Sequence, residues 1–150
     1  MPDKYKIPIK LIKLDEKSYH LLIVAKINKV KVNLIIDTGA SRTVFDKSLL
    51  GDDLKVTEPH KSGEIQSAGI MAANIESVQG TAASFKLGKL KLRNFQVILI
   101  DLEGINLLYK KATGKKVHGL LGSDFLLQMK AVINYDKEIL FLTKPDAGDH

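Results

Sequence analysis

One short motif in the sequence contains a carboxylate that could take part in catalysis. Three apolar residues, 34–36, run directly into Asp37-Thr38-Gly39-Ala40-Ser41. An ionised carboxylate that follows a buried strand is destabilised unless partners or solvent stabilise it there. One interpretation is a tight turn, in which the Asp37 carboxylate accepts backbone N–H groups and Gly39 supplies a left-handed φ. The other interpretation is a functional carboxylate that a strand presents to a reaction site.

A second motif lies about eighty residues further along the chain. It is the string Val117-His118-Gly119-Leu120-Leu121-Gly122-Ser123-Asp124-Phe125-Leu126, an apolar stretch with glycines that leads into a possible short helix. The two strings, in this order and with a glycine-containing region between them, resemble the aspartic protease family. The similarity spans roughly residues 21–141 and points to the single-lobed, retropepsin-like branch, including its bacterial members.

The resemblance implies an all-β fold. We expect residues 1–150 to form a single retropepsin-like domain, a closed β-barrel of the acid-protease type with one or two short helices. The family's supporting strand would run beneath the Asp-Thr-Gly loop, and residues Leu120, Leu121 and Gly122 match it.

The resemblance also implies roles for individual residues. Asp37 would be the catalytic carboxylate, the Thr38 hydroxyl would bond across a twofold axis, and Gly39 would let a substrate backbone approach. The substrate-binding residues would be Ala40 and Ser41, which line the cleft, together with Gly69 and Ile70 at the tip of a mobile flap.

The single Asp-Thr-Gly motif predicts an assembly. Hydrolysis by this chemistry needs two carboxylates, one that accepts a proton from water and one that donates a proton to the carbonyl oxygen. We therefore expect a homodimer in which Asp37 and its symmetry mate share one proton. The implied function is a homodimeric aspartic endopeptidase that acts on peptides or proteins without a metal, another cofactor or a covalent intermediate. The alternative is a non-catalytic peptide-binding or dimerisation module that retains the protease fold.

Other chemistries have weak support in the sequence. Cysteine is absent, which excludes disulfides and thiol nucleophiles. The histidines are far apart and lack the spacing of a metal site, so we expect no metal and a structural role for His118. The run Gly114-Lys115-Lys116 lacks the first glycine and the hydroxyl residue of a phosphate-binding loop, and no serine has the context of a nucleophile.

The net charge of +6 raises the question of an anionic partner. Of the basic residues 21 are lysines and two, Arg42 and Arg93, are arginines, and the aromatic residues are scattered. Nucleic-acid recognition favours arginine forks and stacking aromatics, so we expect no nucleic-acid partner. The lysines at 110, 111, 115 and 116 could hold an acidic partner, but a solvated helix end is the favoured interpretation.

The patterning of apolar residues predicts mainly strands. Strands are expected over residues 7–11, 21–27, 30–36, 74–78, 81–87, 95–100 and 117–121, with a closing hairpin over 131–135 and 139–143. A helix or turn is expected over 43–50, a loop over 51–64, a helix over 103–113 that ends at Gly114, and a short helix over 124–129 capped by Ser123. No segment has the pattern of a signal peptide or a membrane-spanning helix, so we expect no membrane partner and a cytoplasmic location unless a leader or anchor is missing from the sequence.

Overall fold

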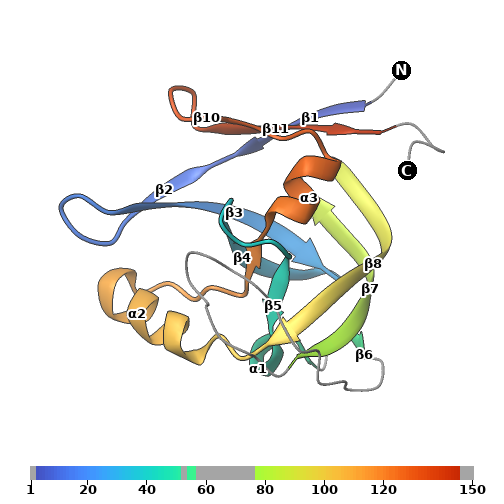
Figure 1. The fold of residues 1–150 in the computed structure, drawn as a ribbon, viewed down its shortest axis with the longest axis horizontal. Helices are drawn as coiled ribbons and strands as arrows, with labels where there is room; N and C mark the ends of the chain where they lie inside the picture. Colours follow the sequence, from blue (N-terminus) through green and yellow to red (C-terminus); the bar gives the residue numbers. More distant parts are fainter. Residues whose placement is uncertain (1–2, 52–53, 57–76, 146–150) are drawn as a thin grey trace.

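The structure is a computed structural model that describes residues 3–51, 54–56 and 77–145 (Figure 1). Its strands are β1 (Asp3–Pro8), β2 (Lys10–Lys13), β3 (Tyr19–Ile27), β4 (Val30–Ile36), β5 (Val44–Asp46), β6 (Lys55–Val56), β7 (Val78–Leu87), β8 (Leu90–Ile100), β9 (Gly119–Leu121), β10 (Val132–Asn134) and β11 (Ile139–Lys144). Its helices are α1 (Lys47–Leu50), α2 (Glu103–Thr113) and α3 (Ser123–Gln128).

The strands close into a barrel. One sheet has the order β2-β3-β4-β9-β5-β8-β7-β6, and an additional pairing of β3 with β7 joins its two sides. The ring is mixed, because β4 pairs with β9 in parallel and β5 pairs with β8 in parallel, whereas the other pairs in it are antiparallel. The all-β closed barrel that the sequence predicted is therefore confirmed.

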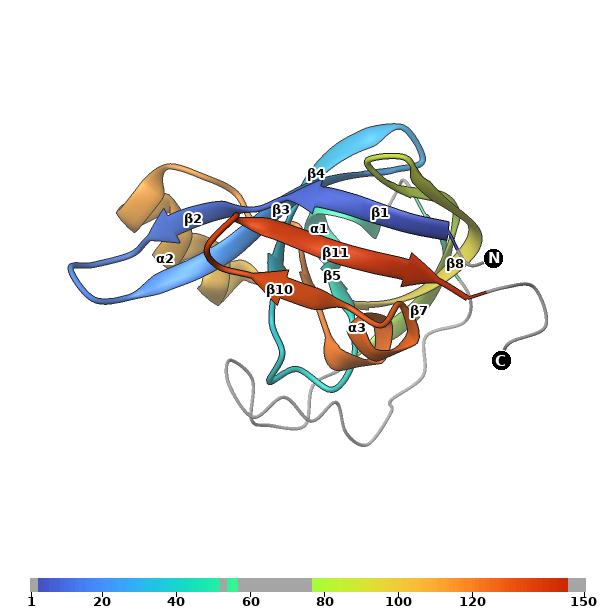
Figure 2. The same ribbon diagram turned by 90° about the horizontal axis from the view of Figure 1, so that it is seen from above.

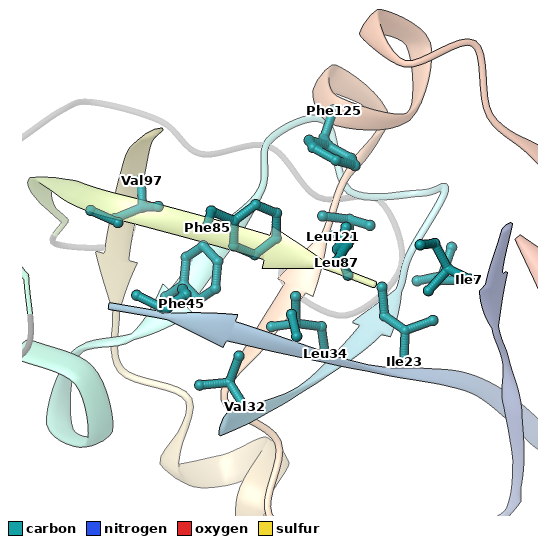
Figure 3. Close-up of a cluster of buried hydrophobic side chains, with 14 of the residues drawn as sticks. Ile7, Ile23, Val32, Leu34, Phe45, Phe85, Leu87, Val97, Leu121 and Phe125 are labelled. Carbon is teal, nitrogen blue, oxygen red and sulfur yellow. The ribbon is translucent and has the colours of Figure 1, made fainter. Parts of the chain in front are cut away.

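Aliphatic side chains together with several phenylalanines fill the interior of the barrel (Figure 3). The ring of Phe85 stacks on that of Phe95 with centroids 4.4 Å apart, and it meets Phe45 and Phe125 edge to face. Phe125 comes from α3, so this helix closes one end of the core. Such offset and edge-on contacts stabilise a core beyond the area they bury.

A second apolar cluster lies on the outer face of the same strands, beneath α2. Its members are Ile12, Leu22, Ile35, Val44, Ile100, Leu102, Tyr109, Val117 and Leu120. Leu34 and Ile36 belong to the barrel interior, whereas Ile35 between them belongs to this outer cluster. Both faces of β4 are therefore buried, which explains the continuous apolar run that precedes Asp37.

A second sheet packs beside the barrel (Figures 1 and 2). It has the order β1-β11-β10, with β1 antiparallel to β11 from Asp3↔Lys144 to Pro8↔Ile139. The predicted closing hairpin is present as β10 and β11. The chain's first strand completes this sheet before it continues into β2.

Several local predictions were wrong or incomplete. The strands predicted over 74–78 and 81–87 are one continuous strand, β7, from residue 78 on, and residues 74–76 lie outside the described residues. Residues 44–46 form strand β5 rather than part of a helix or turn, and residues 55–56 form the short strand β6 within the predicted loop. Helix α3 begins at Ser123, and its N-cap residue is Gly122, which lacks a capping side chain. By contrast, α2 spans the predicted 103–113, and Gly114 ends it with a φ of 73°. No helix in the described ranges is long and apolar enough to cross a membrane.

Candidate active site

Asp37 begins a tight loop at the end of β4. Its backbone N–H donates to the carbonyl oxygen of Leu121 at 3.0 Å, which continues the parallel pairing of Ile36 with Leu121. Its Oδ1 accepts the N–H of Gly39 at 3.0 Å, and its carbonyl oxygen accepts the N–H of Ala40 at 3.1 Å. The local turn is therefore real, and it holds the carboxylate in one orientation.

The other carboxylate oxygen, Asp37 Oδ2, is buried and has no hydrogen-bond partner among the described residues. Buried polar atoms are almost always paired, because an unpaired one keeps the full cost of losing water. A simple surface turn would not leave this oxygen buried.

Strand β9 supports the loop from below. It lies between β4 and β5, where Ile35 pairs with Leu120 on one side and Val44 pairs with Leu120 on the other. Just past the strand, the N–H of Ser123 donates to the carbonyl oxygen of Ala40 at 2.8 Å. Both arms of the Asp37 loop are therefore bonded to one segment that lies more than eighty positions away in sequence.

Gly122 makes the closest approach to the loop. A Cβ at this position would lie 2.7 Å from the carbonyl carbon and oxygen of Arg42 and 2.9 Å from the carbonyl oxygen of Ala40. Its φ of −94° is open to any residue, so the glycine is required for space and not for backbone conformation. The contact is with residues 40–42, just beyond the Asp-Thr-Gly triplet itself.

Thr43 links the loop to α3. Its hydroxyl accepts the N–H of Gly122 at 3.0 Å and donates to Asp124 Oδ1 at 2.8 Å. Arg42 Nε lies 3.8 Å from Asp124 Oδ2, but both side chains are largely exposed, so solvent screens this pair. The buried hydroxyl bridge, rather than the ion pair, holds the loop against α3.

A histidine–tyrosine pair lies on the same side of the sheet as Asp37. The buried Tyr109 hydroxyl is hydrogen-bonded to Nδ1 of His20. The antiparallel register pairs Leu22 with Ile35, and extending it by two residues places His20 opposite Asp37. Burial, and secondarily the charge of Asp37, raises the pKa of Tyr109, so its hydroxyl stays protonated. The sequence analysis missed this pair. Counting back from the β3–β4 turn could have placed His20 near Asp37, but it could not have placed Tyr109, which comes from α2.

Buried polar groups hold helix α2 against strand β5 and against the segment that precedes β9. Asp46 is 1% exposed and accepts the N–H of Leu102 at 3.3 Å and the amide of Asn106 at 3.2 Å. Asn106 also bonds both backbone groups of Val117, accepting its N–H at 2.7 Å and donating to its carbonyl oxygen at 2.9 Å. These bonds fix the helix that carries Tyr109 against the start of β9.

His118 has the structural position expected for it. Its Nδ1 accepts the backbone N–H of Asn33 at 3.0 Å, which requires that this nitrogen carry no proton. Burial, assisted by the nearby Lys116 charge, lowers the pKa of His118. The imidazole therefore joins β4 to the segment before β9 in its neutral form.

The remaining predicted site residues fall into three groups. Thr38, Gly39 and Ser41 are exposed, and Ala40 is 2% exposed. Gly69 and Ile70, the predicted flap tip, lie outside the described residues. Within the part of the chain that the structure describes, no three histidine, aspartate or glutamate side chains gather as they would around a metal ion.

Comparisons with known proteins indicate the family of this chain. The model of a family described as aspartyl protease matches residues 23–125. A search of curated proteins by sequence finds no match.

Solved structures with this fold come from bacterial, viral and eukaryotic sources. A retropepsin-like aspartic protease from Rickettsia conorii has a TM-score of 0.51 and 21% identity, with 96% of this chain and 92% of that chain covered. The EIAV protease in complex with the inhibitor HBY-793 has a TM-score of 0.54 and 15% identity, with coverage of 82% and 99%. The retroviral protease-like domain of Ddi1 from Leishmania major has a TM-score of 0.51 and 15% identity, with coverage of 88% and 99%.

Proposed function

The chain belongs to the aspartyl protease family and has a retropepsin-like fold, and from this premise we propose that it is a homodimeric aspartic endopeptidase. Each active site would be formed by Asp37 of two chains. The substrate class is a polypeptide in extended conformation, and the reaction is hydrolysis of a peptide bond by water.

The observation that supports this proposal most strongly is the state of the Asp37 carboxylate. Oδ1 is held by the Gly39 N–H, whereas Oδ2 is buried without a partner among the described residues. Two such groups that meet on a twofold axis cannot both ionise easily, so they share a proton. The shared proton produces an acid and a base from identical residues.

The proposed reaction begins with a water molecule between the two carboxyl groups. The ionised Asp37 accepts a proton from the water as its oxygen bonds to the scissile carbonyl carbon, and the protonated Asp37 donates its proton to the carbonyl oxygen. The resulting tetrahedral diol collapses when the protonated Asp37 donates a proton to the leaving amine, the C–N bond breaks, and the ionised Asp37 accepts a proton from one diol hydroxyl, which restores the singly protonated pair. No covalent bond to the protein forms at any stage.

The neighbouring residues would act by position. The exposed Thr38 would bond to its counterpart across the axis, and Gly39 would admit the substrate backbone because it has no side chain. The exposed Ser41 would follow along the cleft, and the buried Ala40 would lie beneath it. The bonds of the loop to Leu121 and Ser123 would keep each carboxyl group in place while the substrate binds.

The test is hydrolysis of an unstructured protein such as casein by the wild-type chain and by two amide variants. Asp37→Asn should abolish hydrolysis, because an amide cannot supply or accept the shared proton. Asp101→Asn is a matched control, since Asp101 Oδ1 accepts the N–H of Glu103 at 2.8 Å in the same kind of turn. The control should retain wild-type activity.

Two results would contradict the proposal. Hydrolysis that persists in a purified Asp37→Asn chain would exclude Asp37 as the catalytic group. A wild-type dimer that binds peptides but cleaves none across acidic and neutral pH would instead identify a non-catalytic module with the protease fold.

A further inference from the structure

The two hairpins β3–β4 and β7–β8 carry charge of one sign. Residues 19–36 and 77–100, which include both hairpins, contain no aspartate or glutamate. Their charged residues are all basic, namely Lys26, Lys29, Lys31, Lys86, Lys89, Lys91 and Arg93. The pairing of β3 with β7 brings the two hairpins together, and Figure 2 shows their turns side by side.

Four of these lysines form a row across four strands. Lys31 pairs with Lys26 between β4 and β3, and Lys26 pairs with Lys86 between β3 and β7. Lys86 then pairs with Lys91 between β7 and β8. Directly paired residues point to the same face with Cβ atoms about 4.5–5.5 Å apart, and like charges at that spacing are destabilising.

Nothing in the described ranges neutralises this row. All four side chains are exposed, and none of them forms an ion pair with a described carboxylate. A barrel could avoid the repulsion by alternating charges across its strands. The arrangement therefore favours an anionic partner.

A hollow lies beside the row. Its volume is about 470 Å³, and it is lined by Lys26, Asn28, Lys29, Ala83, Ser84, Lys86 and Lys91. Two bonds fix the hairpins to each other here, because Ser84 N–H donates to Asn28 Oδ1 at 3.0 Å and Asn28 N–H donates to the Ser84 carbonyl oxygen at 2.9 Å. We call this hollow, together with Lys31, the lysine groove.

We propose that the lysine groove binds an extended acidic segment of a polypeptide. Carboxylates on one side of an extended chain repeat at about 6.6 Å, a spacing that flexible lysine side chains on neighbouring strands can follow. No aromatic residue lines the groove, so it lacks the stacking surface that single-stranded nucleic acids use. Its concave shape also suits a narrow chain better than the plane of an anionic membrane.

The groove is separate from the Asp37 loop. Lys31 lies near the start of β4, and Asp37 directly follows the end of this strand. Their separation of six residues corresponds to a distance of about 20 Å at ~3.3 Å per residue. Binding should therefore not need an intact catalytic carboxylate. The inactive Asp37→Asn chain can be used for the binding experiment, so the outcome does not depend on the proposed peptidase function.

The experiment measures binding of a fluorescein-labelled decaglutamate peptide to the Asp37→Asn chain by fluorescence anisotropy at low salt. Added Lys26→Glu and Lys86→Glu substitutions should weaken binding by about tenfold or more, because each reverses a charge at the centre of the row. The matched control carries Lys110→Glu and Lys111→Glu at the exposed end of α2, which reverse the same number of charges away from the groove. This control should change the Kd by less than about twofold. The double substitution Lys26→Gln and Lys86→Gln, which removes the two charges without reversing them, should weaken decaglutamate binding less. Thermal unfolding should show that every variant is folded.

Several results would overturn the proposal. Absence of decaglutamate binding by the folded chain would exclude the groove as an acidic-peptide site, as would an equal loss in the α2 control. Tighter binding of a ten-nucleotide single-stranded DNA, or of vesicles with phosphatidylserine, than of decaglutamate would assign the groove to a different partner.

Discussion

Substitution of Gly122 by alanine tests the contact that positions the Asp37 loop. The added Cβ would lie 2.7 Å from two backbone atoms of Arg42, whereas ordinary contacts begin near 3.4 Å. The backbone at Arg42 would have to move by about 0.7 Å, and the neighbouring Ala40 is already bonded to Ser123. Overpacking against backbone of this kind costs about 1–3 kcal/mol, which corresponds to a loss of roughly 3–10 °C in Tm.

The loss of activity should exceed what the loss of stability explains. A displacement of this size at the loop should lower kcat/KM by about tenfold or more at a temperature where the variant is fully folded. The assays are thermal unfolding by circular dichroism and hydrolysis of a fluorogenic peptide.

Two other glycines provide controls for this substitution. Gly119→Ala places a Cβ 2.6 Å from the Val44 carbonyl oxygen inside the barrel, so it should lower Tm while the folded fraction keeps its activity. Gly104→Ala on α2 meets nothing within 4 Å and should be neutral or slightly stabilising. If Gly122→Ala matches Gly104→Ala in both Tm and kcat/KM, the close approach of Gly122 to Arg42 does not position the loop.

Three further predictions concern pH and the support of α2. Peptide hydrolysis should be fastest at acidic to mildly acidic pH, where the Asp37 pair holds one proton, and a pH–rate profile that rises steadily above pH 8 would indicate another base. The lowered pKa of His118 means that the unfolded chain binds a proton more readily, so the free energy of unfolding should fall as pH drops below about 6.5. His118→Gln should flatten this dependence in urea unfolding between pH 5 and 7, and an unchanged slope would argue against it. Asn106→Ala should destabilise the chain by about 2–3 kcal/mol, because it leaves the buried Val117 N–H unpaired, and a loss below about 0.5 kcal/mol would show that α2 is held by other contacts.

The sequence predicted the strands that carry strong alternation or long apolar runs. The apolar residues of β3 and β4 follow one another closely in the sequence, so these strands can be predicted without knowing which strands they pair with. The Asp-Thr-Gly loop was visible for a similar reason, because a carboxylate after Ile36 interrupts an apolar run. The 103–113 helix was also predictable, because Gly114 can adopt the left-handed backbone conformation that ends a helix.

The features that the sequence analysis missed depend on contacts between distant segments. Strand β5 has three residues and exists because Val44 pairs with both Leu120 and Ile98. The His20–Tyr109 pair forms only when α2 packs over β3. In the same way, the lysine row emerges from the register of four strands, and no local pattern distinguishes its members from the other surface lysines.

The most direct test of the central claim is a subunit-mixing titration. Wild-type chain at constant concentration is mixed with increasing Asp37→Asn chain, and subunit exchange is verified by native mass spectrometry of isotope-labelled protein. If each site needs Asp37 from both chains and dimers are tight, a threefold excess of the variant should reduce hydrolysis to about one quarter. Hydrolysis that stays constant while heterodimers demonstrably form would contradict the shared active site.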